Sequence, residues 1–398
     1  MMKIIPVLDR KTEKQFIDFP RWLYRNDPNY VFQFDSDIRK AFDKKHNSYF
    51  NHGDARRWII LNENGKCLGR IAAFYDSAKD NTDYYIKSGG CGFFECIDDR
   101  QAAFLLFDTA RDWLKENGYE AMDGPINFGE NDTNWGCLVH GFIPQGYGMS
   151  YNFPYYKSLF ESYGFKLYYR QFSFHMDLDK PFPERFWKIA EWINNRPGYS
   201  FKHFNYRKVD KFVSDIVTIH DQAWKELKED FTPMNPGTLY DEMNKAKPII
   251  DPELIWFAYY NDEPVAFFIF FPDANQIFRR MNGKLHLINK IRFILMKKGK
   301  KITRLRGLAA GVVPKFQNSG VESGIFWQIK QVMEHRKHIK QFELSWVGDY
   351  NPKMISLYLA TGAYHAKTHH TYRYLFNPDT PFIRYMPDAV DESKLPEY

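Results

Sequence analysis

The chain has 398 residues, of which 44% are hydrophobic and 18% aromatic, so it can build more than one large core. No stretch approaches the ~18 consecutive apolar residues of a membrane-spanning helix, and we therefore expect no transmembrane segment. The net charge of +6 is unevenly placed. Twelve lysines and arginines but no acidic residue lie between Asp273 and Glu322, whereas the rest of the chain is net acidic.

The cysteines and the first residues argue against two further classes, metalloproteins and secreted proteins. Cys67, Cys91, Cys96 and Cys137 form no C-x-x-C pair and have no matching histidine spacing, so we predict free thiols in a reducing compartment and no metal site. The opening sequence, MMKIIPVLDR, lacks the apolar stretch of a signal peptide and predicts a first strand. We expect a cytoplasmic protein.

Residues 1 to about 195 combine strand and helix patterns. Predicted strands cover residues 3–8, 58–61, 68–75 and 91–97, and predicted helices cover 13–24, 36–43 and 101–117. Asp98 and Asp99 cap the last of these helices and Gly118 ends it. Asn64-Gly65, between the second and third strands, predicts a hairpin turn.

The same order of elements recurs in the second half of the chain. Predicted strands lie at 200–204, 254–260 and 265–271, and predicted helices at 209–227 and 239–245. The repeat predicts an α+β protein with two domains, residues 1–180 and 198–398. A linker at 181–197, with a short helix at 184–194, joins them, and the second domain carries a basic insertion at 274–304.

A glycine-rich segment, residues 124–148, does not fit this repeat. It holds six glycines, and its polar residues stand among Trp135 and Phe142. One interpretation is a wall of an acceptor site, where Asn127 and Asn131 bind substrate. The other is an irregular loop between the domains, in which the asparagines stabilise turns.

The acid-free segment, residues 279–306, predicts a basic amphipathic helix, because Ile291, Ile294 and Leu295 alternate with lysines such as Lys297 and Lys298. Three interpretations stay open: a solvated cationic face, binding of coenzyme phosphates or an acidic carrier, and binding of RNA or a membrane. Nucleic acid is not favoured, because the rest of the chain is net acidic.

The most informative stretch runs from residue 305 to residue 364. A strand over 308–313 ends at Pro314, and Gln317-Asn318-Ser319-Gly320 precedes an amphipathic helix. A second strand is predicted at 342–347, and then Asn351-Pro352 begins a helix that ends at Gly362. A strand, a glycine loop and a helix in this order present backbone N–H groups to an anion.

This stretch resembles the coenzyme-binding half of the GNAT superfamily of N-acetyltransferase-like proteins. The family pattern V-x-P-x-[YF]-[QR]-x-x-G-x-[GA] is similar to residues 312–322, and its later N-x(6–7)-Y-x-x-x-G-[FY] is similar to Asn351, Tyr358, Gly362 and Tyr364, with one residue inserted before the aromatic. Glu322 departs from the pattern, which has Gly or Ala there. The resemblance implies two tandem GNAT-like domains, each a mixed, mostly antiparallel sheet flanked by helices. The first lacks the coenzyme loop, because Asp98-Asp99-Arg100 fills that turn.

The resemblance also implies that the second domain binds acetyl-CoA or another acyl-CoA as a substrate. The coenzyme-binding residues carried over from the family motif are Val312, Val313, Gln317, Asn318, Ser319, Gly320, Val321 and Asn351. A carboxylate at Glu322 would repel the phosphates, so its replacement by glycine should tighten binding.

Two residues are candidates for proton transfer. Tyr358 stands where the family has its general acid, and the alternative is a core aromatic residue. No acid or histidine lies on the strand before Pro314. Glu343 on the next strand is therefore the nearest candidate base, with a water chain as the alternative. His369 and His370 are adjacent on a predicted strand at 367–375, face opposite sides and are interpreted as structural.

These observations predict an N-acyltransferase that moves an acyl group from acyl-CoA to an amine of a small molecule or peptide. The chain also resembles peptidyl transferases that use aminoacyl-tRNA and a group of bacterial GNAT-like proteins. The alternatives are therefore an aminoacyl-tRNA-dependent transferase, or a non-catalytic protein that binds a ligand or partner. The sequence predicts neither the acceptor nor the oligomeric state.

Overall fold

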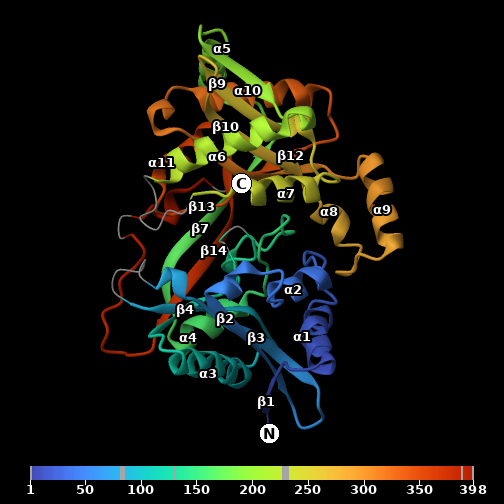
Figure 1. Ribbon diagram of the computed structural model, residues 1–398, viewed down its shortest axis with the longest axis vertical. Helices are drawn as coiled ribbons and strands as arrows, with labels where there is room; N and C mark the ends of the chain where they lie inside the picture. The colour runs from blue at the N-terminus through green and yellow to red at the C-terminus, as the bar shows by residue number, and fades with distance from the viewer. Residues whose placement is uncertain are drawn as a thin grey trace.

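The computed structural model describes residues 2–80, 86–129, 131, 133–225, 233–386 and 389–396. Its strands form one mixed sheet flanked by helices, so the predicted α+β class is confirmed (Figure 1). The strands are β1 (Lys3–Pro6), β2 (Gly53–Leu61), β3 (Cys67–Asp76), β4 (Ser88–Cys96), β5 (Ala121–Gly124), β6 (Cys137–His140), β7 (Lys166–Asp177), β8 (Tyr199–His203), β9 (Ile255–Tyr260), β10 (Glu263–Pro272), β11 (Arg304–Val312), β12 (Gln341–Glu343), β13 (Val347–Gly348) and β14 (Tyr364–Leu375). The helices are α1 (Arg10–Leu23), α2 (Asp35–Ala41), α3 (Arg100–Glu116), α4 (Tyr155–Tyr163), α5 (Glu184–Asn194), α6 (Val209–Lys225), α7 (Pro236–Ala246), α8 (Asn275–Phe278), α9 (Leu287–Lys298), α10 (Val321–Glu334) and α11 (Pro352–Ala360).

The element order repeats as the sequence predicts. The first half, β1 to β7, and the second half, β8 to β14, each place two helices after the first strand and one helix between the two parallel strands. In the second half, α8 and α9 are inserted between β10 and β11. The strands lie in the order β1-β2-β3-β4-β5-β14-β7-β12-β11-β10-β9-β8, with β6 on β14 and β13 on β7.

The two halves exchange their last long strands. β14, the final strand of the chain, pairs with β5 of the first half, and β7 of the first half pairs with β12 of the second. β7 and β14 also pair with each other, antiparallel, from Tyr364 opposite His175 to Arg373 opposite Lys166. In Figure 1 they run side by side through the middle of the molecule, β7 in green and β14 in red. The predicted division at 181–197 stays a prediction, because the sheet is continuous across both halves.

Most predicted elements are present, but one predicted strand is divided and several strands and helices were not predicted. The strand expected at 342–347 is divided into β12 and β13, which both pair with β7, and only β12 also pairs with β11. β7 was not predicted. Its signal is the alternation of Phe172, Phe174 and Met176, which are all buried, with polar residues.

Each half has its own large apolar core. In the first half, α3 and α4 pack on β2 to β5 through residues such as Leu106 and Phe160. In the second, α10 and α11 pack on β7 and β10 to β12 through residues such as Ile325 and Phe342. The local signals explain these helices: Asp99 accepts the Ala102 N–H at the start of α3, and Asn351 accepts the Met354 N–H at the start of α11.

We predict that Arg373 on β14 is a principal link between the exchanged strand and the first half. Its guanidinium is 2% exposed, donates two hydrogen bonds to Asp123 on β5 (2.6 and 2.7 Å) and lies 3.8 Å from the Tyr168 ring centre. Arg373→Ala should lower the free energy of unfolding by about 3–5 kcal/mol, because Asp123 loses its buried partner. Urea denaturation measures this loss.

The matched control is Lys188→Ala. Lys188 also pairs with a carboxylate, that of Glu184 (2.8 Å), but both side chains are more than 70% exposed. This change should cost ~0.5 kcal/mol or less. Equal losses for the two variants would mean that the exchanged strand is not held by Arg373.

Candidate active site

The sheet contains two parallel strand pairs, and each separates after a short contact. β11 and β12 pair at three positions, the last being Arg306 opposite Glu343. Beyond this pair, β11 continues along β10 to Val312. The segment that follows Glu343 runs along β7 instead. In the described part of the chain, no strand pairs with this edge of residues 307–312. We call this gap, between residues 307–312 and Ser345, the strand opening.

The β11 edge of the strand opening is irregular. Ile269 on β10 pairs with Ala309 and Phe270 with Gly307, so Leu308 is an extra residue without a β10 partner. A β-bulge of this kind redirects backbone groups away from the ladder. Gly307 is the point of closest approach, since a Cβ there would lie 3.0 Å from the Ser345 nitrogen. Backbone N–H and C=O groups on this edge can therefore pair with an extended ligand.

Tyr358 of α11 reaches the strand opening from the core side of the sheet. Its hydroxyl lies 2.6 Å from the Ser345 hydroxyl, and its ring packs on Phe174 with the centres 5.6 Å apart. Burial raises the pKa of Tyr358 to about 12, although the Ser345 hydrogen bond and the Arg306 charge lower it in part. The phenol is therefore protonated near neutral pH and can donate a proton at the strand opening.

A buried charge cluster lies on the opposite face of the sheet, where the parallel pairing ends. It consists of Asp273, Arg304, Arg306, Glu343, Lys367 and His175, which are all at least nine-tenths buried. Side chains alternate along a strand, so Arg306 and Glu343 face away from Leu305 and Phe342, which belong to the core with Tyr358. The proton donor and the charges therefore approach the strand opening from opposite faces.

Glu343 is the centre of the cluster. Its carboxylate accepts a hydrogen bond from Lys367 (2.5 Å), and it lies 3.5 Å from Arg304 and 3.8 Å from Nε2 of His175. Burial alone would raise the pKa of Glu343, but the Lys367 and Arg304 charges outweigh burial and hold it well below its usual range. Burial lowers the pKa of Lys367 to about 8 and also lowers that of His175, so the imidazole is neutral.

Several polar atoms of the cluster are buried without a hydrogen-bond partner among the described residues. These are Nε and Nη1 of Arg306, Oε2 of Glu343 and Nε2 of His175. A buried polar group without a partner costs about 1–3 kcal/mol. A polar ligand or a water molecule could supply the missing partners.

The glycine-rich segment of the first half covers this cluster. A Cβ on Gly146 would lie 2.7 Å from Oε2 of Glu343 and 3.1 Å from Nη1 of Arg306, so only glycine fits there without displacing the charges. The Tyr147 N–H donates to Asp273 (3.1 Å), and Arg304 donates to the Pro144 carbonyl (3.2 Å). The segment thus forms a wall beside the strand opening.

The N-terminus of α10 has backbone N–H groups that an anion could bind. Gly320 precedes it with φ +86°, and no side chain caps the helix. The first intrahelical bond starts from the Gly324 N–H, so the N–H groups of residues 321–323 have no intrahelical acceptor. The carboxyl group of Glu322 belongs to this first turn, and the residue is half-buried. Burial raises the pKa of that carboxyl.

The equivalent place in the first half is closed. β4 and β5 also separate after three paired positions, but the Ile126 N–H pairs with the Cys91 carbonyl (2.9 Å) and fills the gap. A Cβ on Gly92 would lie 1.8 Å from the Ile126 oxygen. The N-terminus of α3 is already capped by Asp99 (3.0 Å). Of these two equivalent places, only the second-half one is open.

The chain is similar to known proteins in sequence and in fold. No family model matches the chain. It is 26% identical over 378 residues to a bacterial ceramide synthase of Caulobacter vibrioides, covering 93% of this chain and 97% of that one. A tandem GNAT protein from the clavulanic acid biosynthesis pathway superposes with a TM-score of 0.55 at 11% identity, over 96% and 100% of the two chains. A GCN5-related N-acetyltransferase from Sphaerobacter thermophilus superposes with a TM-score of 0.51 at 9% identity, over 96% and 98%.

The chain has a GNAT-like fold. In this GNAT-like protein the residues predicted to bind coenzyme lie along one path. Val312 ends β11 and Val313 follows it, residues 317–320 form the turn, and Val321 begins α10. Asn351 lies at the next helix, where its side chain caps α11. Their coenzyme-binding role stays a prediction.

The two asparagines predicted to bind substrate lie apart from the strand opening. Asn131 donates to the Tyr169 hydroxyl (2.9 Å) and accepts from Gln171 (3.2 Å), both on β7. Asn127 is half-buried next to Gly129. Within the described residues, no hydrogen bond joins either asparagine to Tyr358 or Glu343. The wall of the site comes from Gly146 and its neighbours in the same segment instead.

Sequence reasoning missed Arg306, Lys367, His175 and Ser345. Charged residues at the first and third positions of β11 (Arg304 and Arg306) are unusual for a central strand, and this signal could have found Arg306. The adjacent His369 and His370, interpreted as structural, bond to the Ser150 carbonyl (3.0 Å) and the Tyr372 hydroxyl (3.1 Å).

The cysteines and other candidate ligands form no metal site in the described residues. Cys91, Cys96 and Cys137 are buried free thiols, and Cys67 is a half-buried one.

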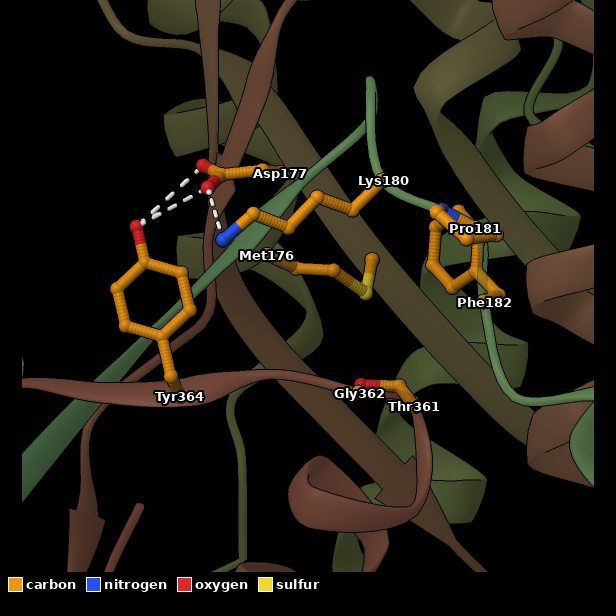
Figure 2. A pocket seen from close by; sticks show the side chains of 8 residues that line it. All are labelled: Met176, Asp177, Lys180, Pro181, Phe182, Thr361, Gly362 and Tyr364. Carbon is orange, nitrogen blue, oxygen red and sulfur yellow. Dashed lines mark hydrogen bonds and ion pairs between the residues drawn. The ribbon is translucent and has the colours of Figure 1, made fainter. Parts of the chain in front are cut away.

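Two cavities lie away from the strand opening. The smaller, of about 220 Å³, lies between the end of β7 and the α11–β14 turn, and Figure 2 shows Lys180 and Tyr364 pointing at Asp177 within it (3.5 and 3.3 Å). The larger, of about 590 Å³, lies between α1 and residues 279–282. Because the polar groups of the smaller cavity are paired with one another, it offers less to a ligand than the charge cluster does.

We predict that Glu322 makes coenzyme A binding dependent on pH. Below its raised pKa the carboxyl is neutral and stops repelling phosphates, so affinity should rise severalfold as pH falls through that pKa. Glu322→Gln should bind at neutral pH as tightly as the natural chain does in acid. Calorimetry with coenzyme A at several pH values measures both.

The variant is also the control for titration of the coenzyme's own phosphates, which affects both proteins alike. If the natural chain and Glu322→Gln show the same affinity at every pH, Glu322 does not face the phosphates.

Proposed function

We propose that the chain is an N-acyltransferase that transfers a fatty acyl group from acyl-CoA to the amino group of a long-chain amino alcohol. The observation that carries the proposal is the strand opening, with a protonated tyrosine on one face and a buried charge cluster on the other. The similarity to a protein described as a bacterial ceramide synthase, over nearly the whole of both chains, supports the acceptor class. Ceramides are amides of fatty acids with long-chain amino alcohols.

The acyl donor would lie in the strand opening. Its pantetheine amides would pair with the free edge of residues 307–312, as an added strand does. Its phosphates would meet the N–H groups of residues 321–323, where the helix dipole favours negative charge. The bulge at Leu308 would turn backbone N–H groups toward the thioester carbonyl and stabilise the oxyanion that forms there.

Tyr358 would complete the breakdown of the intermediate. The amine nitrogen forms a bond to the thioester carbon, and the carbon–sulfur bond then breaks. The leaving thiolate takes the Tyr358 proton, and the Ser345 hydroxyl at 2.6 Å offers a route for its replacement. The raised pKa of Tyr358 keeps the proton in place until the thiolate forms.

His175 suits the role of proton acceptor better than Glu343 does. The pKa of Glu343 is held well below its usual range, which makes it a weak base. The His175 imidazole is neutral, and its Nε2 lies 3.8 Å from Glu343, whose negative charge would stabilise the imidazolium. In this proposal His175 takes the proton from the amine, and Glu343 acts through His175.

Arg306 is suited to bind the hydroxyl groups of the acceptor. Nε and Nη1 of its guanidinium are buried and lack a hydrogen-bond partner among the described residues. Hydroxyl oxygens of an amino alcohol would accept hydrogen bonds from them, which removes the cost of leaving them unpaired. A simple alkyl amine offers no such acceptor, so we expect a preference for amino alcohols.

One observation favours the non-catalytic alternative. Glu322 adds a carboxyl group to the first turn of α10, where the phosphates would bind. A chain that neither binds coenzyme A nor forms an amide would fit that alternative, so the experiment below separates the two.

The test is to incubate the purified chain with acyl-CoA donors from acetyl to palmitoyl and with sphinganine, and to detect the amide by mass spectrometry and the released thiol by colour. We expect amide and thiol in equal amounts. Tyr358→Phe should lower kcat by ~10²-fold, because the thiolate then leaves without a proton.

Tyr374→Phe is the matched control, because Tyr374 packs against Tyr163 and Phe165 in the first half. It should retain nearly full activity. A Tyr358→Phe protein that is folded and less than threefold slower would return Tyr358 to a packing role. No amide with any donor would remove the acyltransferase proposal.

A further inference from the structure

The inserted segment between β10 and β11 forms a hairpin of α8 and α9 at the edge of the molecule. Figure 1 shows α9, in orange, farthest from the central strands on that side. No helix in the described residues has both the length and the apolarity needed to span a membrane. Any membrane contact through α9 would therefore be at the surface.

The outward face of α9 is apolar. Its exposed side chains are Leu287 (72% exposed), Ile288 (72%), Ile291 (50%), Ile294 (52%) and Leu295 (64%). Leu287, Ile291, Ile294 and Leu295 follow the i, i+4, i+7, i+8 spacing of one helix face, and Ile288 lies at the border of that face. Single exposed apolar residues are common, but a continuous stripe of large aliphatic side chains marks an interaction surface.

The opposite face of α9 fixes this orientation. Phe293 is buried and stacks on Phe278 of α8 (5.4 Å between ring centres). Asn289 is also buried and donates to the carbonyls of Met281 (3.1 Å) and Lys284 (2.7 Å). The helix therefore has one face packed on the protein and a second apolar face directed outward.

Positive charges border the apolar stripe. Lys290 and Lys298 are exposed on α9, and so are Lys284, Lys300 and Lys301 beside it. Arg279 and Arg280 line the cavity of about 590 Å³ at the base of the hairpin. No acidic residue occurs from residue 274 to residue 321. The surface therefore combines aliphatic side chains with unbalanced positive charge.

We propose that α9 docks this protein on an anionic phospholipid surface. The helix would lie parallel to the membrane, with its aliphatic stripe at the boundary of headgroups and acyl chains and its lysines among the phosphates. A solvated cationic face would not require the stripe, and RNA binding would depend on charge alone. Of these three interpretations, only a membrane uses both features of this surface.

Docking would also place the strand opening near lipids. α9 is joined by residues 299–303 to β11, whose bulged edge forms the strand opening. This consequence rests on the proposed function, but the docking itself does not. Membrane binding and amide formation are measured separately, so either can fail alone.

The experiment is flotation of the purified chain with vesicles of phosphatidylglycerol and phosphatidylcholine, and with vesicles of phosphatidylcholine only. We expect binding to the first and at least tenfold weaker binding to the second. Ile291→Ser/Leu295→Ser should weaken binding to the anionic vesicles by about a hundredfold, since each buried aliphatic side chain contributes roughly tenfold or more. Lys290→Gln/Lys298→Gln should weaken it by at least about tenfold.

Leu8→Ser is the matched control, because Leu8 is 85% exposed but lies at the start of α1. It should bind vesicles as the natural chain does. A second measurement uses a dye whose emission rises in apolar surroundings, attached to a cysteine at one of two positions. On Ile291→Cys its emission should rise with anionic vesicles. On Leu8→Cys it should not.

Three results would overturn the proposal. The first is no flotation with either vesicle. The second is equal flotation of the natural chain and Ile291→Ser/Leu295→Ser. The third is a dimer in solution that this double variant makes monomeric while vesicles stay unbound, since the stripe would then contact a second copy.

Discussion

The structure depends on the point where β11 and β12 stop pairing. Arg306 and Glu343 are the last parallel pair, and after them the sheet opens. The side chains that surround this opening come from other strands and from α11. Lys367 donates a hydrogen bond to the Glu343 carboxylate on one face, where His175 lies 3.8 Å from the same carboxylate, while Tyr358 and Ser345 meet at the other face. The first half has the same strand separation but fills it with its own backbone at Ile126.

The exchange of β7 and β14 makes this site a product of both halves. His175 belongs to β7 of the first half, and Gly146 to the segment that precedes it, whereas Arg306, Glu343 and Lys367 belong to the second. Neither half alone would hold the complete charge cluster. The closed first half therefore has a structural part in the candidate site: it supplies one strand and one wall.

The sequence predicts the local features and misses the long-range ones. Asn351-Pro352, the Gly320 turn and the Asp99 cap act within one turn of a helix, so their residue types reveal them. The strand exchange leaves no local trace in the sequence. β7 and β14 are both long strands, and either could pair with β5 or with β12. The cluster around Glu343 joins strands far apart in the chain, and periodicity does not say which charges meet. The α9 pattern predicts an amphipathic helix, but only the packing of Phe293 shows that an aliphatic face points outward.

The central claim is that the acyl donor occupies the opening of the second half and not its closed counterpart in the first. Hydrogen–deuterium exchange with and without a non-hydrolysable acyl-CoA analogue tests it most directly. We predict slower exchange at residues 307–312 and 317–323, because the N–H groups in these ranges that lack an acceptor would gain one, and no change at residues 91–102. Protection at 91–102, or none at either place with the analogue in excess, would contradict the account.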